Sequence, residues 1–381
     1  MVTPAKKRII GTDSRNYNPQ KNFRVLPLQN YEFKEVRDIY KILNWLSFKI
    51  QNKNPLEFLN SFRDFDINGV DLFHFFNGIS YGKKPWVTTF ESALPRWGDV
   101  SDRKKEQGLR LLAGKPCKQL IGFSECSKNI QKDYIQSFFP AFADDILPKL
   151  SFLHPTQKPA IQSITEKNPP KDFIRFVLVG ADFFRKGGLE TLHVFDRMIA
   201  AGAPLQLVII SKMDAGDYAT HAGAEEKAEA MKLISKHPNQ ITWHKQLPNQ
   251  DVIKLLRDSH IGLLPTWADT YGYSILEAQS AGCAVLSTDI RVMPEINTTE
   301  TGWVISVKKD SWGDAILRND SDRRSFSQHL ESKLEETLQE IISDPTSIIV
   351  KGQAGFERIK KYHNPALRAI EMESVYDAAL K

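Results

Sequence analysis

Cysteine is scarce in this sequence, and its three residues, Cys117, Cys126 and Cys283, show no CxxC pairing. This argues against a disulfide framework or a structural zinc site and favours a reducing compartment. No apolar run approaches the roughly 18 residues that a membrane-spanning helix requires. The basic start, MVTPAKKRIIGTDS, lacks the apolar stretch of a signal peptide. We therefore expect a cytoplasmic protein.

Internal repeats and low-complexity tracts are also absent, and a composition of 41% hydrophobic and 25% charged residues is typical of a globular protein. A chain of 381 residues is too long for a single core, which predicts two domains. The proline-rich segment 154–172 is typical of an interdomain linker. We expect an N-terminal domain over 1–153, a C-terminal domain over 173–355, and terminal helices over 356–381 that pack back toward the N-terminal domain.

Short apolar runs alternate with helical patterns on both sides of this segment. The runs that predict strands are KRIIGT, FRVLPL, VDLFHFF, PWVTTF, KQLIGFS, FIRFVLVG, LQLVII, QITWH, HIGLLP and AVLST. Such alternation predicts an α/β protein with parallel sheets covered on both faces. We expect two Rossmann-like domains facing across a cleft, with ligand-binding residues directly after the strands.

The stretch DTYGYSILEAQSAG, residues 269–282, follows the predicted strand HIGLLP. Gly272 lets the backbone approach a ligand closely, and the amides of Gly272, Tyr273 and Ser274 lie at a helix start that suits an anion. The structural alternative is a capping box, in which Ser274 caps the helix and Glu277 reaches back.

The surrounding sequence, LLPTWADTYGYSILEAQSAGCAVLSTDIRVMPEI, resembles the donor-binding segment of retaining GT-B glycosyltransferases of family GT4. The resemblance implies that Asp269 holds hydroxyls of a donor sugar and that Glu277 holds the ribose hydroxyls of its nucleotide. The turn between them, with Tyr271, Gly272, Tyr273 and Ser274, would carry the phosphates. Carboxylates suit this task because they accept strong hydrogen bonds from hydroxyls.

A second motif, LVGADFFRKGGLETL, follows the first strand of the C-terminal half. By resemblance to the same family, Lys186 binds the diphosphate, and charge that develops on the leaving phosphate requires such a cation. The family also has an arginine where this chain has Ala181. Arg185 is the candidate replacement, and a solvated turn is the structural alternative for the whole motif.

In the N-terminal half, the family often has a histidine near the transferred sugar, at the position of Glu91. Glu91 is a third catalytic candidate beside Asp269 and Lys186, and an ion pair with Arg96 is the structural alternative. His74 is predicted to be a core histidine. The family's opening glycine-rich loop has no counterpart in RIIGTDSRNYNPQKNF, which contains one glycine.

The resemblance implies a retaining, metal-independent transferase without a cofactor, in polysaccharide, glycan or glycolipid synthesis. Its donor would be a nucleotide-sugar, with UDP favoured and GDP second, and its acceptor a saccharide or a lipid-linked hydroxyl. The alternatives are a GT-B nucleotide-sugar epimerase and a non-catalytic nucleotide-sugar-binding subunit. A nucleic-acid binder is disfavoured, because the basic residues of the first half are scattered.

Charge is divided unevenly along the chain. Residues 1–172 contain 27 Lys and Arg against 18 Asp and Glu, whereas the remainder contains 24 against 28. A basic first half suits peripheral contact with an anionic membrane surface, and a solvated basic face is the alternative.

Overall fold

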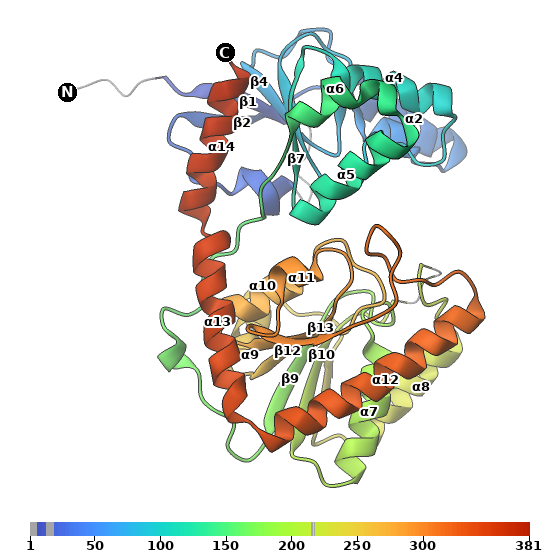
Figure 1. The fold of residues 1–381 in the computed structure, drawn as a ribbon, viewed down its shortest axis with the longest axis vertical. Helices are drawn as coiled ribbons and strands as arrows, with labels where there is room; N and C mark the ends of the chain where they lie inside the picture. Colours follow the sequence, from blue (N-terminus) through green and yellow to red (C-terminus); the bar gives the residue numbers. More distant parts are fainter. Residues whose placement is uncertain (1–5, 13–18, 215, 217) are drawn as a thin grey trace, which may run out of the picture. The chain divides into compact units, whose positions relative to one another are not determined.

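The chain folds into two compact units, each with its own sheet (Figure 1). The structure, a computed structural model, describes residues 6–12, 19–214, 216 and 218–381. Unit 1 comprises residues 1–156 together with 363–381, and unit 2 comprises residues 157–362. The chain thus leaves unit 1, builds all of unit 2, and returns to unit 1.

The main sheet of unit 1 has six parallel strands in the order β2-β1-β4-β6-β7-β8. Strands β4 and β6 lie in its middle and are almost entirely buried, as expected of a parallel sheet covered on both faces. The strands of unit 1, including a separate two-stranded pair β3-β5, are β1 (Arg8–Thr12), β2 (Tyr31–Glu35), β3 (Ser61–Phe62), β4 (Leu72–Phe76), β5 (Ile79–Ser80), β6 (Trp86–Phe90), β7 (Cys117–Gly122) and β8 (Leu150–Phe152).

Alternate residues of these strands enter two separate cores, because successive side chains of a strand point to opposite faces. Trp86 and Leu120 belong to one core, whereas Val87 and Ile121 belong to the other. The second core is completed by the C-terminal helix α14 (Figure 1). The helices of unit 1 are α2 (Ile39–Gln51), α3 (Leu56–Leu59), α4 (Asp102–Ala113), α5 (Glu125–Phe138), α6 (Ala143–Ile146) and α14 (Pro365–Ala379).

The second core contains His74, which confirms the prediction of a core histidine. Its side chain is fully buried, with Nδ1 2.7 Å from the Tyr376 hydroxyl and Nε2 2.9 Å from Thr89 Oγ1. Burial lowers the pKa of His74 to about 3, so the ring is neutral and can accept one hydrogen bond while donating the other. His74 therefore joins β4, β6 and α14.

Unit 2 has a six-stranded parallel sheet in the order β11-β10-β9-β12-β13-β14. From β9 the chain builds outward to β11 and then returns to place β12 on the other side of β9. This reversal of order is a topological switch point, where ligands bind beyond the carboxyl ends of the strands. The strands are β9 (Ile174–Val179), β10 (Leu205–Ile210), β11 (Ile241–His244), β12 (Ile261–Leu264), β13 (Ala284–Thr288) and β14 (Gly302–Ile305).

Helices α7, α8 and α12 pack together on one face of this sheet, and α9, α10 and α13 pack together on the other (Figure 1). Their bounds are α7 (Gly188–Ala200), α8 (Ala224–Lys236), α9 (Asn249–Arg257), α10 (Tyr273–Ser280), α12 (Asp320–Ser343) and α13 (Thr346–Tyr362), with a short α11 (Met293–Ile296) after β13. None of the described helices is long and apolar enough to cross a bilayer.

The predicted strand FRVLPL is wrong. Residues Gln20–Arg24 form a short π-helical turn, and the strand β2 begins only at Tyr31. Pro27 interrupts the run, since proline cannot donate to a strand ladder. The leucines on either side of it, Leu26 and Leu28, are buried as anchors of a loop. The neighbouring residues 13–18 of the opening loop lie outside the described residues.

The proline-rich segment 154–172 does not form a separate linker. The chain passes between the units at Thr156, and from Gln157 onward it belongs to unit 2. Ile161 is buried, and Lys167 Nζ donates to the carbonyls of Leu256 and Arg257, both at 2.9 Å. The return to unit 1 lies at His363, later than the predicted boundary after residue 355. The prolines correctly indicated an irregular segment, but its packing makes residues 157–172 part of unit 2.

Candidate functional site

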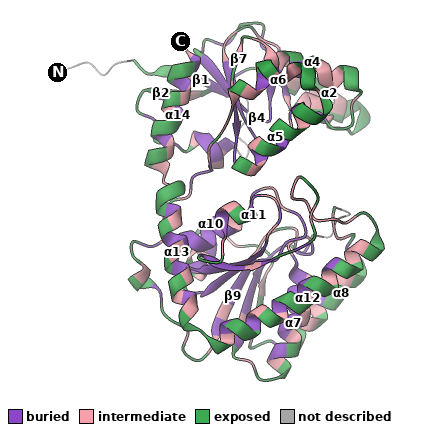
Figure 2. Ribbon diagram, in the orientation of Figure 1, coloured by how far each residue is buried: buried purple, intermediate pink, exposed green. Residues whose placement is uncertain are grey.

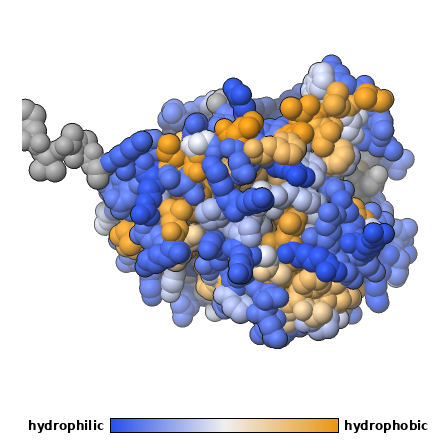
Figure 3. Space-filling model, turned by 90° about the horizontal axis from the view of Figure 1, so that it is seen from above, coloured by the Kyte–Doolittle hydropathy of each residue, from blue (hydrophilic) through white to orange (hydrophobic). Residues whose placement is uncertain are grey.

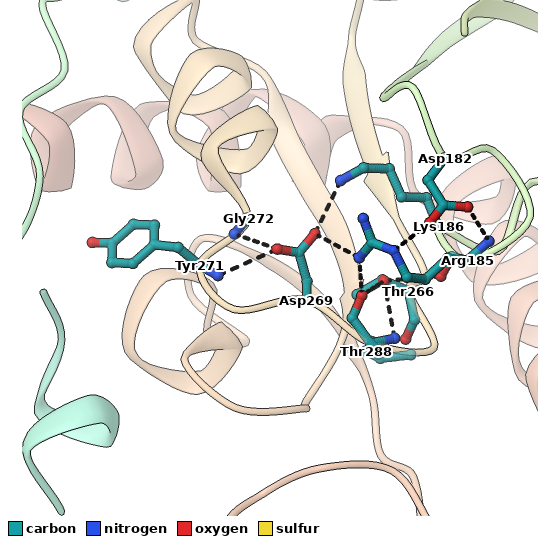
Figure 4. A network of polar contacts seen from close by, with 9 residues as sticks. Asp182, Arg185, Lys186, Thr266, Asp269, Tyr271, Gly272 and Thr288 are labelled. Atoms are coloured by element: carbon teal, nitrogen blue, oxygen red, sulfur yellow. Dashed lines mark hydrogen bonds and ion pairs between the residues drawn. The ribbon is translucent and has the colours of Figure 1, made fainter. Parts of the chain in front are cut away.

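Two loops meet at the switch point of unit 2, one after β9 and one after β12 (Figure 4). The Trp267 amide donates to the Arg185 carbonyl at 2.8 Å, and Thr266 Oγ1 donates to the same carbonyl at 3.0 Å. Thr288 Oγ1, at the end of β13, donates to the Thr266 carbonyl at 2.8 Å. Main-chain groups and threonine hydroxyls thereby hold the loops together before any charged group is considered.

Each loop ends in a glycine that begins a helix in the left-handed region. Gly187 has φ 74° before α7, and Gly272 has φ 77° before α10. A Cβ at Gly187 would overlap the Pro265 carbonyl, and one at Gly272 would lie 2.8 Å from Met293 Cε. Only glycine combines this conformation with such close approach. The two helix starts can therefore lie side by side at the carboxyl edge of the sheet.

Asp269 lies at the centre of the site. Its Oδ2 is 2.9 Å from Lys186 Nζ and 3.7 Å from Arg185 Nη1, and its Oδ1 accepts from the amides of Tyr271 at 3.2 Å and Gly272 at 3.1 Å (Figure 4). The side chains of Asp269 and Lys186 are only 14% and 12% exposed. The structure thus brings together two residues that the sequence predicted as catalytic candidates.

The charges around Asp269 decide its protonation. Burial alone would raise the pKa of Asp269, but the ammonium of Lys186 and the guanidinium of Arg185 outweigh it and hold the pKa below its ordinary value. Asp269 is therefore an anion at neutral pH and can only accept hydrogen bonds. A carboxylate in this state suits a ligand that presents hydroxyl donors.

Arg185 is held in place by groups that the sequence analysis missed. Its Nε donates to Asp182 Oδ2 at 2.7 Å, and its Nη1 donates to the Ala268 carbonyl. The Ala268 carbonyl also lies 2.8 Å from Thr266 Oγ1, whose single proton it shares with the Arg185 carbonyl. The spacing of three residues between Asp182 and Arg185 is a weak sign of this pair, whereas the Thr266 contact has no signal in the sequence.

The capping-box interpretation of Ser274 and Glu277 is wrong. The N-cap of α10 is Gly272, and Ser274 lies inside the first turn, where its buried Oγ has no hydrogen-bond partner. Glu277 lies one turn further along and is only 7% exposed. Glutamate is rarely buried, and Glu277 is buried without capping the helix. Its role in binding a nucleotide ribose stays a prediction.

One of the amides predicted to bind phosphate at the start of α10 already donates to a side chain of the protein. The Gly272 amide, one of the three predicted donors, already donates to Asp269. The Tyr271 ring is buried and stacks on the Tyr273 ring at 5.3 Å, so Tyr271 presents its amide, not its ring, to Asp269.

A cavity of about 520 Å³ lies beside this site and was not expected from the sequence. Its walls include Trp267 and Ala268 of the loop after β12, and the segment Ala315–Arg318 that leads into α12. Asp310 and Arg323 add opposite charges to its lining. No recognisable motif marks the 310–318 segment, so the sequence offered no signal for it.

Glu91, the candidate in unit 1, follows β6 and forms the ion pair with Arg96 that we considered as its structural role. Asn77 Nδ2 also donates to Glu91 Oε1 at 3.2 Å, and Asn77 Oδ1 accepts from the Glu91 amide at 3.2 Å. A catalytic role of Glu91 stays a prediction.

Comparison with known proteins connects this geometry to a family. The family model of glycosyl transferases group 1 matches residues 161–334, which cover most of unit 2 and contain both loops of the site. The phosphatidylinositol N-acetylglucosaminyltransferase gpi3 subunit of Schizosaccharomyces pombe is 23% identical over 208 residues. That match covers 55% of this chain but only 39% of the length of the relative.

Solved structures extend the similarity of the fold to both units. A glycosyltransferase from Rickettsia africae has a TM-score of 0.62 at 13% identity, and the match covers 99% of each chain. HepE from Anabaena, solved with UDP and glucose, has a TM-score of 0.58 at 10% identity, over 98% of this chain and 100% of that one. At such low identity the likeness concerns the fold. The chain therefore has the GT-B fold of two Rossmann-like units, and its residues 161–334 match the family model of glycosyl transferases group 1.

Proposed function

We propose that this protein is a retaining glycosyltransferase that moves a sugar from a nucleotide-sugar to an acceptor hydroxyl. The observation that carries the proposal is the buried cluster of Asp269, Lys186 and Arg185 at the switch point of the group 1 domain. A cation pair beside an ionised acid matches a donor that has a diphosphate at one end and sugar hydroxyls at the other.

Each charged group has a distinct task in this proposal. Lys186 and Arg185 would together balance the negative charge that develops on the leaving diphosphate. Asp269 would accept hydrogen bonds from hydroxyls of the donor sugar, and Glu277 would accept them from the ribose. Asp269 and Lys186 pair with each other in this structure, so donor binding would exchange one ion pair for two new sets of contacts.

The proposed transfer step needs no base from the protein. The acceptor hydroxyl oxygen would bond to the anomeric carbon on the face from which the diphosphate leaves, while the bond from that carbon to the diphosphate oxygen breaks. The hydroxyl proton would pass to the departing diphosphate oxygen, which gives a glycoside and a nucleoside diphosphate. Because no step calls for a Lewis acid, we expect transfer to be insensitive to chelators.

Double displacement through Glu91 is the minor alternative. It requires a carboxylate that is free to attack the anomeric carbon. The Glu91 carboxylate is instead stabilised by its ion pair with Arg96 and by Asn77. These contacts lower its nucleophilicity and favour the single-step reaction.

For the substrates, UDP-sugars are the favoured donors and GDP-sugars come second. The similarity to HepE, solved with UDP and glucose, supports a uridine nucleotide. The similarity to an N-acetylglucosaminyltransferase subunit named for phosphatidylinositol supports a lipid-linked acceptor over a small cytosolic one. We therefore place the reaction in glycan, glycolipid or polysaccharide synthesis.

A non-catalytic nucleotide-sugar-binding subunit is the second candidate. It is favoured by two departures from the pattern that the resemblance implies, namely Ala181 in place of an arginine and Glu91 in place of a histidine. Such a subunit would bind the donor and leave it intact with every acceptor offered.

The test is a calorimetric titration with UDP-, GDP- and ADP-sugars of the wild type and of Glu277→Ala and Lys186→Gln. We expect one nucleotide class to bind, and each substitution to weaken that binding by at least about tenfold, because each removes one charge-assisted contact worth roughly 1.5–3 kcal/mol. Glu300→Ala and Lys171→Gln, at exposed positions, are the matched controls.

Release of nucleoside diphosphate, measured with and without saccharide and lipid-linked acceptors and with a chelator present, separates the candidates. Acceptor-dependent release supports the transferase, and donor binding without any release supports the subunit. Failure of a folded wild type to bind any of the three donor classes would overturn both.

A further inference from the structure

Helix α2 of unit 1 is exposed in an unusual way. Its 13 residues, IYKILNWLSFKIQ, are mostly apolar, yet none of them is buried (Figure 2). A helix this apolar normally covers a core. Trp45 is 58% exposed and Ile50 is 76% exposed. Contact with the rest of unit 1 therefore does not account for the composition of α2.

The helix turns its polar side toward the protein. Its partly buried residues are Ile39 at the start of the helix and Tyr40, Asn44 and Ser47, of which the last three share one face at helical spacing. The Tyr40 ring stacks on Tyr81 at 5.6 Å, and Asn44 Nδ2 donates to Asn54 Oδ1 at 3.1 Å. The apolar side points away from unit 1, the reverse of the usual amphipathic arrangement.

Neighbouring segments extend this apolar side. Helix α3 packs against α2 and exposes two leucines, and the loop after β3 exposes a phenylalanine and an isoleucine. That loop and the start of α2 line one hollow of about 790 Å³. Figure 3 shows hydrophobic residues gathered toward the edge of unit 1 on which Figure 1 draws α2. We call the exposed apolar set the α2 surface: Ile42, Leu43, Trp45, Leu46, Phe48, Ile50, Leu56, Leu59, Phe65 and Ile67.

Exposed basic side chains on and beside α2 outnumber the acidic ones. Residues 39–54 contain Lys41, Lys49 and Lys53, all exposed, and no acidic residue. The acids near this surface lie outside the segment: Glu35 comes within 3.9 Å of Lys41, Glu57 pairs with Lys104 at 2.8 Å, and Asp66 is exposed between Phe65 and Ile67. Asp38 and Asp64 are buried. The partner of this surface must therefore offer apolar groups together with negative charge.

We propose that the α2 surface docks unit 1 on an anionic lipid membrane, with α2 lying in the plane of the interface. Aromatic and aliphatic residues on one side of a helix with lysines at its margins are suited to this position, because the apolar groups enter the acyl region while the ammonium groups meet lipid phosphates. The proposal rests on the exposure and charge of α2 and does not depend on the proposed transferase reaction.

A second copy of this chain fits the same surface less well. A symmetric pair of α2 helices would bring the lysines of both copies together. Segment 39–54 has no acid to neutralise them, and the neighbouring acids Glu35 and Glu57 already pair with Lys41 and Lys104 of the same copy. An anionic lipid surface has no such conflict.

The experiment is flotation of the full chain with vesicles of phosphatidylcholine alone and of phosphatidylcholine mixed with phosphatidylglycerol. We expect binding to the anionic vesicles and little to the neutral ones. The double variant W45E/I50E should weaken binding by at least about a hundredfold, since it removes two large apolar side chains from the interface. Lys49→Ala should weaken it by roughly fivefold, the effect of one positive charge near an anionic surface.

Ile370→Glu is the matched control, because Ile370 is also an exposed isoleucine of unit 1 (67%) but lies on α14. Trp45→Phe is a second variant that should keep binding while removing the part of the tryptophan emission that brominated lipids quench. Thermal melting checks that every variant is folded.

Three results would overturn the proposal. The first is a folded wild type that does not bind anionic vesicles, and the second is an equal loss of binding in Ile370→Glu. The third is a dimer in light scattering that W45E/I50E dissociates, in a protein that ignores vesicles, which would assign the α2 surface to a second copy of the chain.

Discussion

Asp269 remains ionised although it is nearly enclosed, and the residues around it explain why. Two cations and two backbone amides satisfy its oxygens at distances of 2.9 to 3.7 Å. Removing a partner from such a buried group leaves its charge uncompensated, which costs more than the contact itself contributes. The site is therefore a set of mutually dependent residues.

A substitution at Gly187 would test how closely the two loops must pack. Gly187→Ala should destabilise unit 2 by about 1–3 kcal/mol or more, because φ 74° strains alanine and its Cβ would overlap the Pro265 carbonyl. Gly202→Ala is the control, since Gly202 has φ 85° but no atom within 4 Å of the added Cβ. It should cost only about 1 kcal/mol of backbone strain. Urea unfolding measures both, and equal losses would show that the approach to Pro265 is unimportant.

At this scale the sequence predicted the charged residues better than their contacts. Asp269 and Lys186 stood in motifs of recognisable spacing, so they were found. Thr266 and Thr288 were missed because their roles depend on where β12 and β13 end in three dimensions. The capping box that was the structural alternative for Ser274 does not form, because the left-handed turn at Gly272 starts the helix two residues earlier.

Among the elements, helices α7, α8 and α12 are joined by a cluster of charges. His193 Nδ1 lies 2.7 Å from Glu331 of α12, and its Nε2 lies 3.0 Å from Glu229 of α8. Arg197 of α7 lies 2.9 Å from both Glu331 and Glu335. The hydrogen bond with Glu331, opposed by partial burial and assisted by Glu229, raises the pKa of His193 to about 9.

This shift predicts how the stability of unit 2 depends on pH. Because the folded-state pKa lies above the ordinary value of 6.5, the charged ring stabilises the fold fully below pH 6.5, and the contribution is lost as pH rises toward 9. We expect a loss of about 1–2 kcal/mol across this range once solvent screening is allowed for. His193→Gln should remove this slope in urea unfolding at a series of pH values. His329→Gln, on α12, should keep it, and a slope that persists in His193→Gln would contradict the assignment.

The elements themselves were largely predictable, with two instructive failures. Hydrophobic periodicity located the central strands of both sheets and the long helices, since buried segments have a strong pattern. It failed at FRVLPL, where buried leucines anchor a loop. It also could not reveal which side of α2 faces the protein, because a periodic pattern identifies an apolar face without identifying what covers it.

For the whole molecule, helix α14 ties the end of the chain to unit 1. Ala369, Met372 and Tyr376 belong to the same core as Tyr31 and β4. A chain truncated after Tyr362 should therefore lose the fold of unit 1 while unit 2 stays folded. Limited proteolysis followed by mass spectrometry would detect a protected fragment near residues 157–362. A truncated chain that protects both units equally would show that α14 is dispensable.

The two-domain organisation was visible in the sequence, but its boundaries were not. The prolines of segment 154–172 indicated a break between domains. Lys167, for example, donates to the carbonyls of Leu256 and Arg257, which lie about 90 positions further along the chain. No local sequence pattern contains such a contact. The same holds for His363, whose Nδ1 lies 2.7 Å from the Pro155 carbonyl where the two chain crossings meet.

Because unit 1 is built from both ends of the sequence, the order of synthesis separates the folding of the two units. Unit 2 is complete while the residues of α14 are still to be translated. During the roughly 10 to 40 s that a ribosome needs for the intervening 200 or so residues, the face of the first sheet that awaits Tyr376 stays uncovered. We therefore expect the nascent N-terminal segment to need protection from aggregation during this interval, until α14 is made and covers it.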